Sequence, residues 1–142
     1  MEYRKFDRYY VVRVDKGEEV LSCLKKLCKE ENIRAGLVSG LGAADRVVVG
    51  LFDTEKKQYR KTEITGMMEI TSLTGNISRM SGEPYLHCHI TVCNEKMEVM
   101  GGHLNECHIS GTGEITVTCI EGEIGRKFSD EIGLNLYEFD SI

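Results

Sequence analysis

Several features that assign proteins to particular classes are scarce or missing in this sequence. Its 142 residues include one proline and no tryptophan, and no apolar run is long enough to cross a bilayer. The first residues, MEYRKFDRYYVVRV, carry charges before any apolar stretch builds up, so they do not resemble a secretory signal peptide. We therefore expect a cytoplasmic protein without membrane association.

Basic residues and paired cysteine motifs are also in short supply. The chain has 18 Lys and Arg against 23 Asp and Glu, a net charge of −5, whereas non-specific DNA binding depends on clustered basic residues. The charge therefore argues against a nucleic-acid surface, although an acidic average can hide a local basic patch. No CxxC pair occurs, and a reducing compartment favours free, mostly buried thiols over disulfides. The six cysteines are Cys23, Cys28, Cys88, Cys93, Cys107 and Cys119.

The residue pattern predicts one domain over residues 1–142, a length that suits a single core. Residues 8–14, RYYVVRV, are rich in β-branched and aromatic side chains and predict a strand. A helix follows, with Asp15 as N-cap and Glu18 three positions later in a capping box. Its predicted buried face is formed by Val20, Leu21, Leu24, Leu27 and Cys28.

Seven further stretches read as strands separated by Gly, Asp, Asn and Lys turn signals. One helix among so many strands favours an α+β fold, in which the helix covers one face of a curled sheet that is antiparallel or mixed. The seven stretches are residues 34–40, 44–53, 57–64, 67–76, 85–93, 97–104 and 113–121.

The most informative chemical feature is a group of three histidines. His87 and His89 lie two positions apart in a predicted strand, so their side chains share one face. A His-x-His pair on a strand places two imidazoles close enough to hold one metal ion, a spacing that recurs in zinc sites.

His103 joins this pair if the register of the predicted hairpin allows it. A loop with an odd number of residues, as when Cys93 pairs with Met97, sets His103 opposite His87 on the same face. A two-residue loop would turn His103 to the other face. We expect the odd loop, or a bulge at Gly101-Gly102 with the same effect.

We therefore predict that His87, His89 and His103 are metal ligands. Three neutral imidazoles leave a fourth position open for water, a substrate or a ligand from another subunit. Zinc is the first candidate, with nickel, iron and manganese as alternatives. The competing interpretation is that these histidines are simply hydrogen-bonded members of a sheet face. His108, near a Gly-rich turn, is expected to be an exposed loop residue.

Two weaker signals receive no functional assignment. The glycine-rich segment 39–43, SGLGA, lies between two strands and not before a helix, so it predicts a turn or bulge rather than a phosphate site. Glu69, Glu106 and Glu114 could supply general acid or base chemistry near a metal, but the sequence gives no distances. No catalytic residue is therefore assigned.

Three segments together resemble one protein family. Residues 66–76, GMMEITSLTGN, resemble the central motif of PPC (plants and prokaryotes conserved) domains, in which a Gly, two variable residues and a Glu lead into a Leu-Thr/Ser-Gly strand end. Residues 99–104, VMGGHL, resemble the Val-x-Gly-Gly-His-Leu segment of the prokaryotic members, and residues 86–89, LHCH, resemble their preceding His-x-His strand. The order of elements is similar over nearly the whole chain.

The PPC resemblance implies a curled, mostly antiparallel sheet of about seven or eight strands with one main helix packed on it. It also implies a homotrimer whose interfaces are formed by the strands. Prokaryotic members are commonly described as DNA-binding because plant AT-hook proteins carry this domain. This chain has no Arg-Gly-Arg-Pro segment of the AT-hook type, so the resemblance implies self-association and protein contacts more than DNA contact.

Three functions follow from these observations. The first is a trimeric binding or regulatory module with a three-histidine metal site and a small-molecule ligand or partner that the sequence leaves unnamed. The second is a DNA-associated regulator. The third is a small zinc enzyme acting on a carbonyl or carboxylated metabolite, because the histidine pattern also resembles the zinc ligands of acetolactate decarboxylases.

Overall fold

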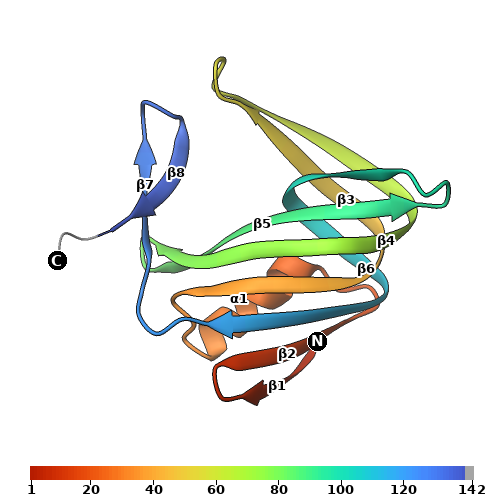
Figure 1. Ribbon diagram of the computed structural model, residues 1–142, viewed down its shortest axis with the longest axis horizontal. Helices are drawn as coiled ribbons and strands as arrows, with labels where there is room; N and C mark the ends of the chain where they lie inside the picture. The colour runs from red at the N-terminus through yellow and green to blue at the C-terminus, as the bar shows by residue number, and fades with distance from the viewer. Residues whose placement is uncertain (140–142) are drawn as a thin grey trace.

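The computed structural model describes residues 1–139, and within them eight strands form one sheet with one helix (Figure 1). This confirms the predicted α+β class. The last three residues of the predicted domain 1–142 lie outside the described residues. The strands are β1 (Glu2–Phe6), β2 (Tyr9–Asp15), β3 (Gly36–Asp53), β4 (Gln58–Met80), β5 (Glu83–Asn94), β6 (Val99–Cys119), β7 (Gly125–Ser129) and β8 (Leu134–Glu138), and the helix is α1 (Val20–Glu30).

The sheet curls until its central strands form a ring of pairings. β3 pairs with β4 and β6, and β5 also pairs with β4 and β6, all of them antiparallel. β1 and β2 extend the sheet beyond β6, and a single parallel pair, Arg79 with Gly125, joins β4 to β7. The predicted curled and mostly antiparallel sheet is therefore present.

Three strands are much longer than predicted, because stretches that read as separate strands run together. β3, β4 and β6 contain 18, 23 and 21 residues. The glycine-rich segment 39–43 lies inside β3, where the register shifts between Gly40 and Gly42. Gly42 has a φ of +153°, and a Cβ there would collide with the carbonyl oxygen of Thr112. The turn or bulge expected in this segment is therefore a bulge at Gly42. A residue larger than glycine could not take this position without strain.

The helix begins later than predicted. Glu19, not Asp15, is the N-cap, and its carboxylate accepts hydrogen bonds from the backbone N–H groups of Leu21 and Ser22. Asp15 does pair with Glu18, whose carboxylate accepts from the Asp15 N–H at 2.9 Å, but this contact lies in the turn before the helix. The buried face is Val20, Cys23, Leu24, Leu27 and Cys28, so Cys23 takes the place predicted for Leu21.

The hydrophobic core lies between α1 and the face of the sheet that packs against it. Leu24 and Leu27 of the helix are fully buried, as are the inward-facing Val12 of β2 and Val92 of β5. Within the described residues, no helix is long and apolar enough to span a membrane. The opposite face of β5 is turned away from this core, which leaves it available for a site.

The C-terminal strands β7 and β8 were not predicted. They pair with each other as a hairpin. The hairpin stands beside a projecting arm, which is formed by the end of β3, the start of β4 and the turn between them at residues 54–57 (Figure 1). The Lys57 ammonium of the arm donates to the backbone carbonyl of Asp130 in the hairpin at 2.6 Å, and Phe52 lies against Gly133. Arm and hairpin therefore form two walls above the strands that carry the histidines.

Candidate metal centre

The three histidines come together on the face of the sheet opposite the core. On β5, the side chains of Cys88 and Ile90 are buried, whereas His87 is half-buried and His89 is exposed, as alternation along a strand requires. His103 lies on β6, directly opposite His89 in the ladder.

The predicted hairpin was right in parity and wrong in register. Five residues, 94–98, separate Cys93 from its partner Val99, so the loop is odd but two residues longer than the one predicted. His103 consequently faces His89 rather than His87. β5 and β6 pair without a shift over this stretch, so no bulge at Gly101-Gly102 is needed. A shift by two residues keeps each side chain on its face, which is why the cluster still forms.

The geometry suits one metal ion. The ring centroids of His87, His89 and His103 are separated by 5.1 to 5.5 Å. One ring nitrogen from each lies within 4.8 Å of the other two. In a tetrahedral zinc site with Zn–N bonds of about 2.1 Å, ligand nitrogens are about 3.4 Å apart, a separation that small side-chain rotations reach. The donor set therefore fits zinc or a similar divalent ion.

Burial keeps two of these imidazoles neutral. Burial is the largest cause and, together with smaller electrostatic contributions from His103, Arg126 and His89, it lowers the pKa of His87 to about 4. The pKa of His103 is also lowered, first by burial and then by His89. Near neutral pH both rings therefore offer a lone pair to a metal, which is the form that coordination requires.

Tyr59 of β4 packs against the histidine cluster on the side of His103. Its ring meets the His103 ring edge-on, with the centroids 6.0 Å apart. The Tyr59 hydroxyl accepts a hydrogen bond of 2.6 Å from the Asn105 side-chain amide. Tyr59 can lie across β3 because Gly50 stands beneath it, where any Cβ would overlap the phenol ring. The arm strands thus restrict the rotation of His103.

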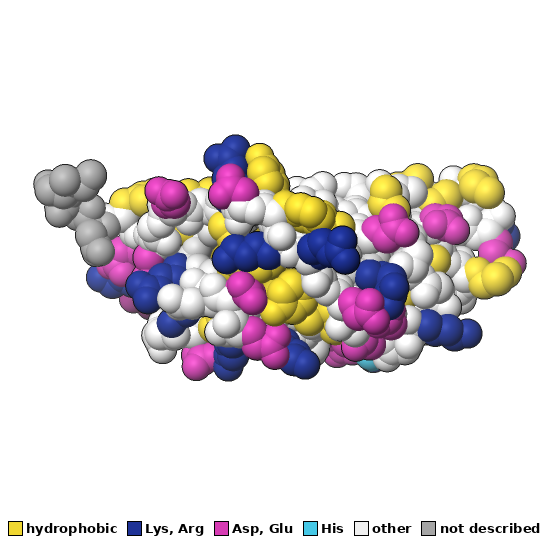
Figure 2. All heavy atoms as spheres, turned by 90° about the horizontal axis from the view of Figure 1, so that it is seen from below, with side chains coloured by type: hydrophobic (Ala, Val, Ile, Leu, Met, Phe, Trp, Pro, Cys, Tyr) yellow, Lys and Arg dark blue, Asp and Glu magenta, His cyan; other side chains and the backbone are white. Residues whose placement is uncertain are grey.

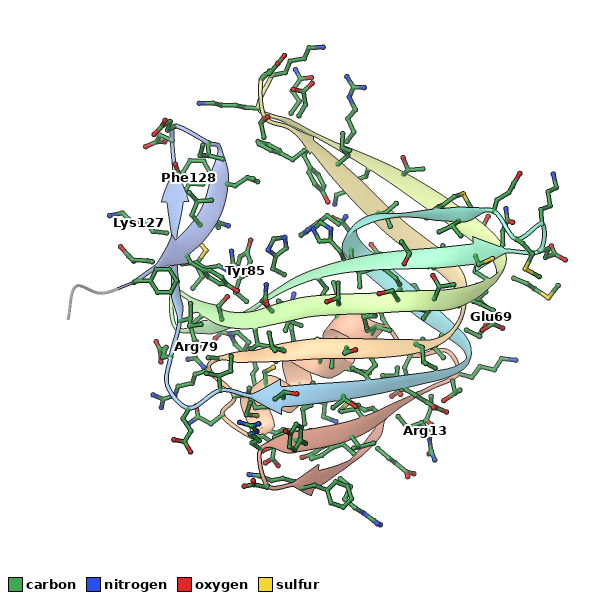
Figure 3. The ribbon with its side chains drawn as sticks, viewed as in Figure 1. Arg13, Glu69, Arg79, Tyr85, Lys127 and Phe128 are labelled. Carbon is green, nitrogen blue, oxygen red and sulfur yellow. The ribbon has the colours of Figure 1, made fainter. Side chains whose placement is uncertain are left out.

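The histidines form the floor of an open cleft of about 830 Å³, a size typical of small-molecule sites. The arm supplies Leu51 and Phe52 to one wall, and the hairpin supplies Leu134, Leu136 and Tyr137 to the other. Tyr85 of β5 also lines the cleft, and Figure 3 shows it near the base of the hairpin. The cleft combines apolar walls with a polar floor.

Arg126 of β7 is the main cleft residue that the sequence reasoning missed. Its guanidinium lies 4.6 Å from the ring centroid of Tyr85 and 4.4 Å from that of Tyr137. It donates to the buried Ser78 hydroxyl and to the Asn135 carbonyl, both at 2.7 Å. The available signal was two short alternating stretches, GRKFS and LNLYE, around a turn that contains Gly133.

The remaining predicted candidates lie elsewhere. His108 is on β6 rather than in a loop, and its Nε2 lies 3.0 Å from a guanidinium nitrogen of Arg46. Arg46 also pairs with Glu106 at 2.7 Å, and neither Glu106 nor Glu114 lines the histidine cleft. Glu69 stands at the far end of the sheet from Tyr85 (Figure 3).

The cysteines are free, and four of the six are buried, namely Cys23, Cys28, Cys88 and Cys107. Burial raises the pKa of Cys28, Cys88 and Cys107 to about 12. These three thiols are therefore protonated and unreactive near neutral pH, as expected for small apolar core groups.

Two solved structures share both the fold and a substantial part of the sequence. A protein of Bacteroides thetaiotaomicron, described as a candidate DNA-binding protein, is 34% identical with a TM-score of 0.96, covering 99% of this chain and 98% of that one. A metal-containing protein of Archaeoglobus fulgidus is 32% identical with a TM-score of 0.87, covering 97% of this chain and 96% of that one.

Two further proteins are similar over a smaller share of their own length. The α-acetolactate decarboxylase of Bacillus subtilis has a TM-score of 0.54 at 9% identity over 86% of this chain and 57% of that one, which is a likeness of fold alone. The bifunctional protein GlmU of a Synechococcus strain is 27% identical over 112 residues, which are 78% of this chain but only 16% of GlmU.

The family assignment rests on the sequence profile and agrees with the motifs. The profile described as the Plants and Prokaryotes Conserved (PCC) domain matches residues 1–121, which include the three histidines and the strands that carry them. The hairpin with Arg126 follows the matched region. The chain therefore belongs to the Plants and Prokaryotes Conserved domain family.

Proposed function

We propose that this chain is a metal-binding module in which His87, His89 and His103 hold one divalent transition metal ion, with zinc as the first candidate. The observation that carries the proposal is the meeting of three ring nitrogens within 4.8 Å on two paired strands. The Archaeoglobus relative, described as metal-containing, supports it.

The cleft above the histidines is where we propose that a ligand of this module binds. Three protein ligands would leave a coordination position free, and a small molecule could reach it through the cleft that the three histidines line. A bound metal would polarise an oxygen of a ligand placed there. We propose that the chain acts as a binding or regulatory module whose input is a small molecule entering this cleft. An enzyme acting on a carbonyl or carboxylated metabolite is the alternative that the open position favours.

Elemental analysis of protein purified without an affinity tag tests the metal site. We expect about one transition metal per chain in the wild type and none in the His87→Ala, His89→Ala double variant. His108→Ala is the matched control, because His108 is tied to Arg46 outside the cluster. Equal metal in the double variant, or no metal in the wild type after incubation with zinc, would contradict the proposal.

We propose further that the chain assembles as a homotrimer. The sheet face opposite α1 exposes Tyr9 and Val11 of β2 and Leu37 and Leu41 of β3, at 38 to 57% of their surface. The two strands are joined through β6, so these side chains lie on one face. Apolar groups gathered in this way are typical of an interface. Light scattering should give three times the chain mass of 16.0 kDa.

DNA binding is the second candidate function. The description of the Bacteroides relative favours it. On the face shown in Figure 2, however, basic and acidic side chains alternate. Several basic side chains of the described residues are also neutralised in ion pairs, among them Arg13 with Glu2 and Lys5 with Glu31. Duplex DNA needs a continuous basic surface, so we expect no gel retardation of duplex DNA at low salt.

We also propose that residues 1–142 form a single cytoplasmic domain. One cluster of buried residues joins α1 to the strands from β2 to β6, which is what a single core requires. Six free cysteines suit a reducing compartment. Fractionation of the native host and a single cooperative unfolding transition would test the two parts of this proposal.

A further inference from the structure

We propose that the cleft binds a small organic carboxylate, whose charged end is held by Arg126 and whose apolar body lies between the arm and the hairpin. This inference deepens the proposed function, since it names the class of ligand that enters beside the metal. It rests on that function only for the part of the ligand that reaches the metal, because the side chain of Arg126 is held by contacts with Ser78, Tyr85, Asn135 and Tyr137 and not by the histidines.

The guanidinium of Arg126 is held in one orientation. Two aromatic rings, those of Tyr85 and Tyr137, flank it at 4.6 and 4.4 Å. The Nε and Nη1 atoms donate to Ser78 and Asn135, whereas Nη2 makes no hydrogen bond to any described residue. A planar donor group fixed in this way has already lost the side-chain freedom that ligand binding would otherwise remove.

The charge of Arg126 has no counter-ion among residues 1–139, although the side chain is partly buried. Arg46, by contrast, forms ion pairs with Glu63 and Glu106 at 2.8 and 2.7 Å. A half-buried cation without an anion is costly. Arg126 lines the cleft, so an anion entering the cleft can supply the missing partner.

The other polar groups of the cleft agree with an anionic ligand. Arg126 lines the same cleft as His87, His89 and His103, so the guanidinium and the histidine cluster face one ligand-binding space. A divalent ion held by three neutral imidazoles would add positive charge at the same end. Both groups attract a carboxylate, and a guanidinium binds one through paired N–H donors.

The walls determine the rest of the ligand. Leu51 of the arm is 68% exposed, and Leu134 and Leu136 of the hairpin are 38 and 42% exposed, yet all three line the same cleft. Facing apolar walls of this kind favour a ligand with an apolar body. Inorganic phosphate would leave them in water. An organic acid with an aromatic or branched aliphatic group matches both parts of the cleft.

Calorimetric titration with 3-phenylpropionate tests the proposal, with the neutral 3-phenylpropionamide as comparison. Full-length protein is titrated both loaded with zinc and metal-free. We expect the acid to bind the wild type more tightly than the amide does, and Arg126→Met to weaken acid binding at least about tenfold in both forms. Lys127→Met is the matched control, because it removes the same charge from the next residue of β7, which points to the opposite side.

Three results would overturn the inference. They are the absence of acid binding to the wild type, equal affinity for acid and amide, and equal acid affinity in wild type and Arg126→Met. Inorganic phosphate competing as well as the acid would overturn the organic part. The acid–amide comparison uses only wild-type protein, so it stands even if Arg126→Met fails to fold.

The outcomes separate this inference from the proposed metal site. Arg126-dependent acid binding in a protein that holds no metal would contradict the metal site alone. Normal metal content with no difference between acid and amide would contradict the carboxylate site alone.

Discussion

The two faces of β5 show how one strand serves both stability and a site. On one face Cys88, Ile90 and Val92 are 1, 2 and 0% exposed and pack in the core with α1. On the other face His87 and His89 line the cleft. Alternation of side chains along the strand separates the two faces completely.

The difference teaches that the core positions the site without taking part in its chemistry. Packing on the inner face fixes the backbone of β5, and through the ladder it fixes β6 and His103. The outer face can then hold polar groups whose desolvation is only partial. Substitution of an outward-facing residue of β5 should therefore change metal affinity, whereas substitution of its inward-facing neighbour should change the free energy of unfolding.

The largest expected effect concerns metal affinity. His89→Ala removes one of three ligands and should weaken zinc binding by more than about 100-fold, since loss of an outer-shell partner alone costs 10–100-fold. Ile90→Ala, one residue away, should leave the zinc affinity of the folded protein within a few-fold of wild type. Competition with a chromogenic chelator measures both. Equal affinities in the two variants would break the comparison.

The reverse order is expected for the free energy of unfolding. Ile90→Ala leaves a cavity in the core and should lower this free energy by about 2–5 kcal/mol. His89→Ala changes an exposed side chain and should alter it by less than about 0.5 kcal/mol. Urea unfolding of the metal-free variants gives both values. A loss above 2 kcal/mol for His89→Ala would show that the outer face also carries stability.

A smaller effect is expected of pH on the free energy of unfolding of the metal-free protein. The pKa of His87 is lowered from 6.5 to about 4, chiefly by burial and further by His103, Arg126 and His89, so between these values the unfolded chain binds a proton that the folded chain does not. The stability of metal-free protein should therefore fall as the pH drops from about 6.5 to about 4, and change no further through this group below that. His87→Gln should flatten the slope in urea unfolding. An unchanged slope would exclude His87 as its source.

The smallest effect on the free energy of unfolding is expected in the hairpin. There Arg126 lines the cleft, whereas Lys127, the next residue of β7, points to the opposite side. The Lys127 side chain is 76% exposed, and its ammonium lies 3.7 Å from the carboxylate of Glu138. Such surface pairs contribute little, so Lys127→Met should change the free energy of unfolding by less than about 0.5 kcal/mol. Arg126→Met should cost more, because it removes two hydrogen bonds and two aromatic contacts. Thermal denaturation ranks the two variants.

Much of the site was predictable because it depends on local periodicity. The two-residue spacing of His87 and His89 requires a shared face, and any odd loop places His103 on that face too. The buried stripe of α1 was predicted for the same reason, with only Leu21 and Cys23 exchanged. The metal bound at the cluster remains a prediction.

The parts that failed depend on contacts between distant segments. The register of β5 and β6 is set by a five-residue loop whose length the turn residues alone do not reveal. The N-cap at Glu19 also accepts from the backbone N–H of Cys107, 88 positions away in the chain. Side-chain hydrogen bonds of that range have no signature in a local window.

By itself the sequence determined the strand-rich class, the helix face and the sharing of one face by His87 and His89, because each follows from the repeat of a single element. Only the tertiary structure decided that the arm and the hairpin enclose these histidines and that Arg126 joins them. The sheet curls through pairings between β3, β4, β5 and β6, and such pairings depend on many cooperating contacts across the chain. The floor of the cleft is therefore a local property of the sequence, whereas its walls exist only in the folded protein.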